Sequence, residues 1–409
     1  MNLKLLLAFI ATISIACGTK NVPTSIAPAP VSAVEAPSAT PLLCGGERMD
    51  AYLPLLKGKR VALVVNHTSM VGPTHLADTL RALGISIQAI FAPEHGFRGA
   101  ADAGEKITDG KDPSTGIPLL SLYGQKRKPS ADDLRNVDWV IFDIQDVGLR
   151  YYTYISTLHY VMESCAENNK PLMILDRPNP NGHFIDGPMR EKGFESFVGM
   201  HPVPVVHGMT VGEYGRMING EGWLPGAAKC RLEVITCSGY DHNTLYQIPI
   251  KPSPNLPDMR SIYLYASTCF FEGTVASEGR GTPTPFQVYG HPDSGTGDYY
   301  FTPASMPGAQ SPKLLGKRCR GYNLSATPIE ELSALHRIDL SHLIRFYQAF
   351  PDKENFFLPS KFIDKLAGSS ALREQITAGK TEAEIRATWQ EGLAQYRSMR
   401  AKYLLYKDF

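Results

Sequence analysis

The sequence predicts an α/β fold: a Rossmann-like, mostly parallel sheet with helices on both faces, followed by a smaller C-terminal α+β domain. Between residues 58 and 237, apolar β-branched runs that end in polar residues alternate with amphipathic stretches. Such alternation is typical of parallel strands joined by crossover helices. The proline-rich segment 249–258 ends this pattern, and Gly- and Pro-rich loops followed by helical stretches replace it. We therefore expect a domain boundary near residue 258.

The predicted strands are continuous apolar runs, which indicate strands buried on both sheet faces. They are RVALVVNHT (60–68), SIQAIFAPE (86–94), WVIFDIQD (139–146), PLMILDRPNP (171–180), VPVVHG (203–208) and LEVIT (232–236). The predicted helices between them are HLADTLRALG (75–84), YYTYISTLHYVMESCAENN (151–169) and VGEYGRMING (211–220). In the last of these, Thr210 and Glu213 have the spacing of a capping box, so Glu213 is not a candidate site residue.

The N-terminus predicts export. Residues 1–17 contain one lysine, an apolar run too short for a comfortable membrane span, and small residues before Cys17, as in a secretory signal. The stretch SIAC resembles the lipobox of bacterial lipoproteins, although Ser14 stands where Leu is usual. We expect lipidation of Cys17, with plain cleavage near Ala16 as the alternative. The protein would then be a lipoprotein of the cell envelope, periplasm-facing or on the surface, held at a membrane only through its lipid.

Three further segments follow the signal. Residues 18–42 are rich in Pro, Ala, Ser and Thr and predict an extended tether. Residues 43–258 form the predicted Rossmann-like catalytic domain, and residues 259–409 form a C-terminal domain that completes the cleft. The first of these domains lacks the G-x-G-x-x-G fingerprint after its first strand, and no G-x-x-x-x-G-K-[ST] motif occurs. We therefore expect no NAD, FAD or ATP, and no other cofactor.

Composition and motifs exclude other classes. The 41 Lys+Arg and 40 Asp+Glu residues give no global field that would attract a polyanion, so nucleic acid is not an expected partner. The chain has no G-x-S-x-G nucleophile elbow and no H-E-x-x-H zinc motif. We therefore expect neither serine-hydrolase chemistry nor a metal site.

Polar side chains stand at the ends of the predicted strands. Because the carboxyl ends of parallel strands share one sheet edge, these side chains are expected to line one crevice. They are Asn66 and His67, Glu94 and His95 with Arg98 nearby, Asp143, Gln145 and Asp146, Asp176 and Arg177, and His207. In IFAPEHGFRG (90–99), Pro93 cannot donate to a ladder, so Glu94 is the first residue past its strand.

Each carboxylate also has a structural interpretation. Glu94 could cap the helix after its glycines instead of acting as an acid. Asp143 could form a buried ion pair with Arg150 or His207. Asp146 could cap a helix that begins near Arg150, and Asp176 could bond its own backbone in the turn that follows.

The second part of the chain adds the stretch FFEGTVASEGRGTPTPF, with Glu272, Glu278 and Arg280 among glycines. Glycine allows the backbone to approach a ligand closely, although a solvated turn is the alternative. Tyr151 and Tyr152 supply flat rings that suit the apolar faces of sugars, or else belong to the core. Carboxylates beside aromatic and amide groups fit glycosidic bond cleavage, which needs an acid for the leaving oxygen and a second group as base, nucleophile or stabiliser.

Several motifs together resemble the exo-β-N-acetylmuramidase (NamZ) family, in order from about residue 45 to the end. They are VVNHTS, FAPEHGFRG, FDIQDVGLRYYTYISTL, LDRPNPNG, HGMTVGEYGRMINGE, PSPNLP and STCFFEGTVASEGRGTPTPF. The resemblance implies an exo-acting glycosidase that releases N-acetylmuramic acid from the non-reducing end of peptidoglycan fragments, with its site between a Rossmann-like and a C-terminal domain. It implies that Glu94, in the P-E-H-G motif, is a catalytic residue.

We accordingly expect Glu94 as general acid and Glu278 or Asp143 as the second carboxylate, with Glu278 preferred. Arg98, Arg150 or Arg280 would bind the lactyl carboxylate of the sugar. The remaining predicted contacts to the substrate come from polar and aromatic residues near the strand ends, namely Asn66, His67, His95, Gln145, Asp146, Tyr151, Tyr152, His207 and Glu272. The alternatives are a non-catalytic lipoprotein that binds peptidoglycan or carbohydrate, and an esterase or amidase acting on the same fragments.

Overall fold

The computed structural model describes residues 40–94, 96–97, 109–124 and 126–409, and Thr40–Phe409 form one compact unit. The predicted signal peptide with Cys17, the tether up to residue 39, and the candidate residues His95 and Arg98 lie outside the described residues. The first pairing of the unit is an antiparallel bridge between Leu43 and Ser238.

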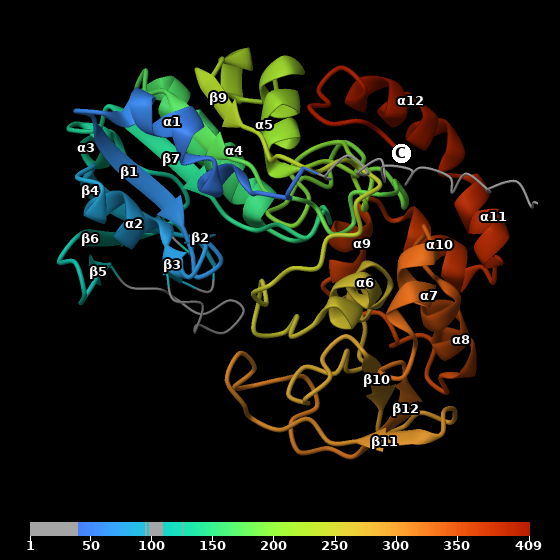
Figure 1. The fold of residues 1–409 in the computed structure, drawn as a ribbon. Coiled ribbons are helices and arrows are strands. Elements are labelled where there is room, and N and C mark those ends of the chain that lie inside the picture. Colours follow the sequence, from blue (N-terminus) through green and yellow to red (C-terminus); the bar gives the residue numbers. More distant parts are fainter. Residues whose placement is uncertain (1–39, 95, 98–108, 125) are drawn as a thin grey trace, which may run out of the picture. The chain divides into compact units, whose positions relative to one another are not determined.

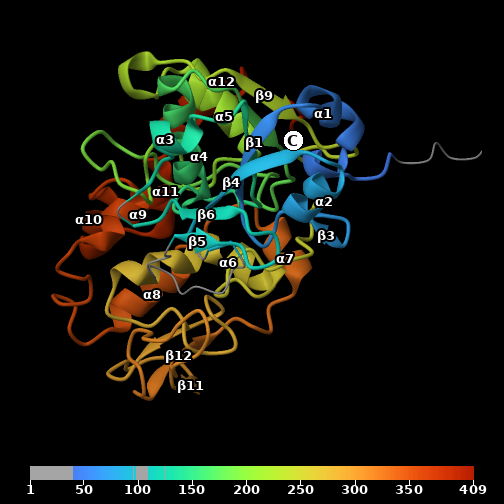
Figure 2. The same cartoon turned by 90° about the vertical axis from the view of Figure 1, so that its left-hand side faces the viewer.

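A seven-stranded sheet forms the core of the N-terminal half (Figures 1 and 2). Its order is β5-β6-β4-β1-β7-β8-β9, and every strand is parallel to its neighbours except β5, which is antiparallel to β6. The strands are β1 (Arg60–Val65), β4 (Ser86–Ala92), β5 (Gly110–Lys111), β6 (Pro118–Ser121), β7 (Trp139–Asp143), β8 (Leu172–Leu175) and β9 (Leu232–Ile235). The chain runs outward from β1 through β4 and β6, and then outward on the other side from β7, so the order reverses at β1 and β7. Ligands of open α/β sheets bind outside the carboxyl ends of strands at such a point.

Helices cover both faces because the buried side chains alternate along each strand. Val61, Leu63 and Val65 pack with the helices α1 (Met49–Leu56) and α2 (Leu76–Ala82). Ala62 and Val64 point to the opposite face and join the cluster that holds α3 (Ala131–Leu134), α4 (Tyr154–Glu167) and α5 (Val211–Gly220). The predicted fold class is therefore confirmed, as is the capping box of Thr210 and Glu213 at the start of α5.

The structure corrects three details of the predicted elements. Residues 203–208 are not a strand, and Val206 makes only isolated bridges, since Pro204 has no N–H to donate. Helix α4 begins at Tyr154, later than predicted. The short strands β5 and β6 were not predicted, and neither was the hairpin of β2 (Met70–Val71) and β3 (Thr74–His75) that follows β1.

The C-terminal half contains a small antiparallel sheet and a group of short helices (Figure 1). The sheet has the order β10-β12-β11, with β10 (Val288–His291), β11 (Tyr299–Phe301) and β12 (Cys319–Asn323). The helices are α6 (Met259–Thr268), α7 (Ile329–Ala334), α8 (Ser341–Ala349), α9 (Phe362–Ala367), α10 (Ala371–Thr377), α11 (Glu382–Ala387) and α12 (Gln390–Arg400). Short 3-10 turns occur at Gly45–Glu47, Pro225–Ala227 and Cys269–Gly273.

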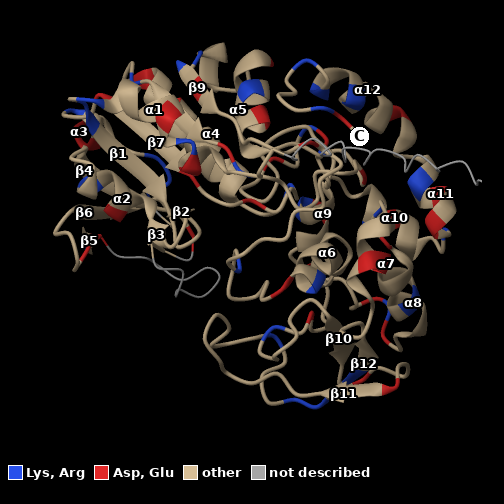
Figure 3. Cartoon of the chain, viewed as in Figure 1, with Lys and Arg blue, Asp and Glu red and all other residues tan. Residues whose placement is uncertain are grey.

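The end of the chain returns to the large sheet. Helix α12 lies beside α5 in both views (Figures 1 and 2), and the Arg216 side chain of α5 donates to the carbonyls of Tyr403 and Leu404. The hydroxyl of Tyr406 donates to the Asp176 carboxylate, 2.6 Å away. Acidic and basic residues are interspersed along the described chain (Figure 3). Within the described residues, no helix combines the length and apolarity needed to cross a membrane.

Candidate active site

A cavity of about 210 Å³ contains the carboxylate that the sequence singled out. Its lining residues follow β4 and β6, surround the start of α4, and come from the loop between β8 and α5, the proline-rich segment and the C-terminal half. They are Glu94, Tyr123, Tyr151, Tyr152, Thr153, Tyr154, Phe197, Val198, Ser253, Asn255, Leu256, Tyr265, Glu272, Arg280, Phe286 and Phe362. The cavity thus brings Glu94, Tyr151, Tyr152, Glu272 and Arg280 together, as the sequence predicted.

Glu94 is held by two hydroxyl groups. The Thr153 hydroxyl, at the N-cap of α4, donates to Oε2 of Glu94 over 2.7 Å. The Tyr123 hydroxyl is also hydrogen bonded to this carboxylate, and burial together with the Glu94 charge raises the pKa of Tyr123 to about 12. The phenol is therefore protonated at neutral pH and donates its hydrogen to Glu94. These contacts orient the carboxylate toward the cavity that it lines.

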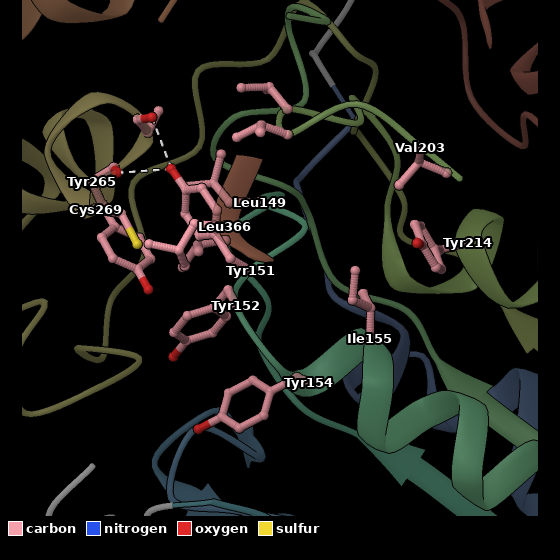
Figure 4. Packing of buried hydrophobic residues seen from close by; sticks show 14 of the residues in the cluster. Leu149, Tyr151, Tyr152, Tyr154, Ile155, Val203, Tyr214, Tyr265, Cys269 and Leu366 are labelled. Carbon is pink, nitrogen blue, oxygen red and sulfur yellow. Dashed lines mark hydrogen bonds between the residues drawn. The ribbon is translucent and has the colours of Figure 1, made fainter. Parts of the chain in front are cut away.

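Aromatic rings form one wall of the cavity (Figure 4). Tyr151 packs edge-on against Tyr265 at 5.2 Å, and Tyr152 packs edge-on against Tyr154 at 4.9 Å between ring centroids. The Tyr151 hydroxyl donates to the carbonyls of Tyr265 and Ala266, which ties the turn before α4 to α6. The wall is thus built across the two halves of the chain, and the hydroxyls of Tyr151 and Tyr152 donate to backbone carbonyls.

The second carboxylate of the cavity is Glu272. It lies in the 3-10 turn Cys269–Gly273 after α6, and its Oε1 is 2.8 Å from Nη2 of Arg280. Glutamates 94 and 272 therefore line the same cavity from opposite halves of the chain. Opposing charges outweigh burial at Arg280, so its pKa lies above the ordinary value and the side chain remains a cation.

Glu278, the preferred second carboxylate, does not line this cavity. Its side chain is only 3% exposed, and it is enclosed by Lys313 at 2.9 Å and Arg280 at 3.4 Å. Burial would raise the pKa of Glu278, but the two cations outweigh burial and hold it below its usual value. The expected position of Glu278 in the cleft is therefore corrected: its side chain is enclosed by two cations and lies outside the cavity lining.

Asp143 is also corrected, because it forms a buried ion pair instead of facing the cavity. Its Oδ1 is 2.5 Å from Nε of Arg177, and its Oδ2 accepts from Nη2 of the same residue at 3.0 Å. A buried ion pair was the predicted alternative for Asp143, with Arg150 or His207 as its expected partner. The partner is instead Arg177, because β7 and β8 are adjacent parallel strands whose ends lie side by side.

A second cavity, of about 550 Å³, lies beyond the ends of β1 and β7. Gln145 and Arg177 line it, and the Gln145 amide donates to the carbonyls of Asp146 and Pro178. Asn66 donates to the Tyr154 hydroxyl, and the His67 ring contacts the Lys251 carbonyl at 2.8 Å. The Asn66 side chain thus contacts the aromatic wall, through Tyr154, and not Glu94.

Asp146 and His207 are buried away from the candidate site. Burial raises the pKa of Asp146 to about 7, and its Oδ1 accepts from the Gly148 amide. It does not cap α4, which begins eight residues later. Burial, with Arg400 and Arg150 nearby, lowers the pKa of His207 to about 3, so this ring is neutral. His207 is not at a strand end because residues 203–208 form no strand.

Arg150 has a structural position that corrects its predicted contact with substrate. It is fully buried, and its guanidinium donates to three carbonyls, those of Pro188, Val203 and Leu366. Burial lowers its pKa to about 10, which still leaves a cation at neutral pH. Of the three candidate arginines, Arg280 is the one that the described residues place at the cavity.

Sequence reasoning did not identify Tyr123, Thr153 or Tyr265 as site residues. Thr153 lies inside a quoted motif, but a threonine at the start of a helix is ordinarily a cap. Tyr123 and Tyr265 lie in stretches whose aromatic residues also fit a core. Among the described residues, no group of three His, Cys, Asp or Glu side chains is arranged to hold a metal ion.

Two family descriptions cover most of the chain. "Exo-beta-N-acetylmuramidase NamZ, N-terminal" matches residues 61–260, and "Exo-beta-N-acetylmuramidase NamZ, C-terminal" matches residues 263–406. The peptidoglycan β-N-acetylmuramidase NamZ of Bacillus subtilis (strain 168) is 37% identical over 375 residues, which is 87% of this chain and 89% of that protein.

Two solved structures of DUF1343 family proteins from Bacteroides fragilis NCTC 9343 are similar to this chain. One is 47% identical with a TM-score of 0.84, and the match covers 90% of this chain and all of the other. The second is 28% identical with a TM-score of 0.77, covering 90% of this chain and 99% of the other.

Two carboxylates in an aromatic-walled cavity, beside a Rossmann-like sheet, are an arrangement that suits a glycoside hydrolase, and the family matches show that class. The family follows from two observations: both family descriptions match the chain, and the Bacillus subtilis relative is similar over nearly its whole length. The chain belongs to the NamZ exo-β-N-acetylmuramidase family.

Proposed function

We propose that the protein is an exo-acting glycosidase that releases N-acetylmuramic acid from the non-reducing end of peptidoglycan fragments, with Glu94 as general acid. The observation that carries this proposal is the position of Glu94, which lines the cavity and is held by the hydroxyls of Thr153 and Tyr123. A general acid must present its proton to the leaving oxygen in a fixed direction. The two hydroxyl contacts supply this orientation.

Glu272 is the second carboxylate of the proposed mechanism. Its carboxylate lines the cavity and is held by Arg280 at 2.8 Å, so it is placed to act as a base, a nucleophile or a group that stabilises an oxocarbenium-like centre. Glu94 and Glu272 would thus divide the two roles, one as the acid and the other as base, nucleophile or stabiliser. The aromatic wall would receive the apolar face of the sugar ring.

Arg280 is the proposed partner of the lactyl carboxylate, which distinguishes N-acetylmuramic acid from N-acetylglucosamine. Its Nη2 is bonded to Glu272 and its Nε is 3.4 Å from Glu278, while the residue still lines the cavity. A guanidinium has five N–H donors, so one cation can serve two carboxylates and a ligand. Positive charge at this point would favour the anionic sugar.

The test compares two substrates of different leaving group. Wild type is expected to cleave both N-acetylmuramyl-β-1,4-N-acetylglucosamine and a nitrophenyl N-acetylmuramide. Glu94→Gln should lower kcat on the disaccharide by about 10²- to 10⁴-fold, the usual range for a general acid. It should lower kcat on the nitrophenyl glycoside much less, because nitrophenolate leaves without a proton. Glu354→Gln, at an exposed position, is the matched control.

Other outcomes would reject the proposal. Equal losses on both substrates would remove Glu94 from the role of acid. Binding without cleavage by wild type would favour the non-catalytic carbohydrate-binding alternative. Release of peptide or acyl groups with the sugar linkage intact, seen by mass spectrometry, would favour an esterase or amidase.

We also propose that the protein is a lipoprotein of the cell envelope, anchored through Cys17. The support is the sequence alone: the apolar N-terminal run, the SIAC stretch and the proline-rich tether that follows. Labelling of cells with a fatty-acid analogue tests the proposal. Label on wild type but not on Cys17→Ser is expected, and unlabelled wild type would instead indicate plain cleavage near Ala16.

A further inference from the structure

Four charged side chains form a chain that leads away from the cavity. Glu272 contacts Arg280 at 2.8 Å, Arg280 is 3.4 Å from Glu278, and Glu278 is 2.9 Å from Lys313. The signs alternate along the chain, and only Glu272 and Arg280 line the cavity. Glu278, at the centre, is almost fully buried. A buried carboxylate away from the substrate and enclosed by two cations requires a function other than contact with the sugar.

Lys313 also holds the backbone that carries Glu272. Its ammonium donates to the carbonyls of Phe271, Thr274 and Ala276, at 2.8, 3.1 and 2.7 Å. Phe271 is the residue before Glu272 in the 3-10 turn Cys269–Gly273. One side chain therefore fixes both the turn that presents Glu272 and the carboxylate that shares its arginine.

We propose that Glu278 and Lys313 are positioning residues for Glu272 and act on it through Arg280. The proposal rests on the function proposed above, in which Glu272 is the second carboxylate of the site. Glu278 shares the Arg280 guanidinium with Glu272, and the positive charge of Lys313 offsets the negative charge of Glu278. The balance of the four charges, together with the fixed turn, sets where Glu272 lies and how readily it takes up a proton.

The other titratable groups that face Glu272 are neutral at working pH. Apart from Arg280 and from Glu94 in the same cavity, those in the described residues are Tyr151, Tyr265 and Cys269. Burial raises the pKa of each of these three well above its ordinary value. The charges that the test below changes are thus those of the chain itself, carried by Glu278 and Lys313.

The test uses opposite changes of charge. Lys313→Met removes a cation and should make Glu272 easier to protonate, so the acid limb of the kcat/KM profile moves to higher pH. Glu278→Gln removes an anion and should move the same limb to lower pH. A unit charge about 10 Å away in an effective dielectric of about 20 changes proton binding by on the order of one pH unit. The double variant should have a limb close to that of wild type.

Matched controls separate this result from simple loss of packing. Lys317→Met removes an exposed lysine from the same loop and should leave the profile unchanged. Thermal unfolding and circular dichroism check that each variant is folded. A merely structural pair would lower the amount of active protein without moving the acid limb in opposite directions.

Two results would overturn the proposal. Folded single variants whose acid limbs coincide with wild type, or move in the same direction, would show that Glu272 does not sense the pair. If neither single variant folds, Lys313→Arg and Glu278→Asp can be used, because they keep the charges and change the side-chain lengths. An unaltered kcat in both of these variants would equally reject the proposal. Absence of glycosidase activity in wild type would instead reject the proposed function, and no profile would then exist.

Discussion

The hydroxyl of Thr153 donates a 2.7 Å hydrogen bond to Oε2 of Glu94. Glu94 follows β4 and Thr153 follows β7, the two strands that flank β1 in the sheet. The bond therefore crosses the point where the strand order reverses, which is where open α/β sheets place their ligands. The position of the candidate site thus follows from sheet topology, and residues of the C-terminal half complete its lining.

Removal of this donor should impair the reaction without disturbing the fold. Thr153→Val keeps the shape and loses the hydrogen bond that orients the proposed acid, which is worth about 0.5 to 1.5 kcal/mol, or roughly two- to twelvefold in kcat/KM. Steady-state kinetics with the muramyl disaccharide measure the effect. Thr157→Val, one turn further along α4, is the control. A higher KM at unchanged kcat would mean that the hydroxyl contacts the sugar instead of Glu94.

The buried pair of Asp143 and Arg177 should matter for stability and not for chemistry. Arg177→Met leaves an unpaired carboxylate in the core, which should lower the free energy of unfolding by about 3 to 5 kcal/mol. Asp143→Asn should destabilise as well, with kcat retained in the folded protein. Urea unfolding and kinetics measure both. Loss of kcat in a stable Asp143→Asn protein would restore Asp143 as a catalytic candidate.

The surface offers a comparison for this pair. Arg60 and Asp138 are bonded at 2.8 Å but exposed, and exposed pairs gain little because solvent screens them. Asp138→Asn should therefore leave Tm essentially unchanged. A large loss of stability in this control would mean that burial is not what distinguishes the two pairs.

The sequence predicted the N-terminal half well because its signals are local. A buried parallel strand reads as an apolar run, and the runs at β1, β4, β7, β8 and β9 were all recognised. The run at 203–208 has the same composition but contains Pro204, which cannot take part in a central ladder. The two-residue strand β5 is too short to leave a pattern. Strand β6 begins with Pro118 and is buried only at Ser121, so it lacks the continuous apolar run of a buried strand.

The candidate site could be predicted only in part, because side-chain direction depends on tertiary structure. Glu272 and Glu278 stand six residues apart in one glycine-rich motif, and nothing in the motif says which of them reaches the cavity. Arg150 precedes two cavity-lining tyrosines, yet it points into the core and binds three carbonyls. Glu94 was identifiable because a proline that ends a strand fixes where the next residue lies.

Asp146 should make stability depend on pH. Burial raises its pKa from 3.8 to about 7, so the folded state binds more protons than the unfolded state between these values. The stability that the neutral form provides is complete below about pH 3.8 and is lost as pH rises through 7. Asp146→Asn removes this loss, so its free energy of unfolding should exceed that of wild type by on the order of 4 kcal/mol at pH 8.

Urea unfolding of wild type and Asp146→Asn between pH 4 and pH 8 measures this effect. The difference between the two proteins should be small at pH 4, grow toward pH 7 and then remain constant. Asp241→Asn, in a less buried turn, is the control and should show no such trend. A difference that does not vary with pH would mean that Asp146 is ionised in the folded protein at all these pH values.

Arg280 and Arg150 were both candidates for binding the lactyl carboxylate, and their replacement should have opposite effects. Arg280→Ala should weaken binding of N-acetylmuramic acid by roughly ten- to a hundredfold, the loss of a charge-assisted contact, and should change binding of N-acetylglucosamine little. The neutral sugar serves as internal control, because any displacement of Glu272 affects both ligands.

Arg150→Lys should keep both affinities and lower Tm, since buried carbonyls that lose a donor cost about 1 to 3 kcal/mol each. Calorimetric titration measures the affinities, and a retained preference for the acidic sugar in Arg280→Ala would move its recognition to Arg98.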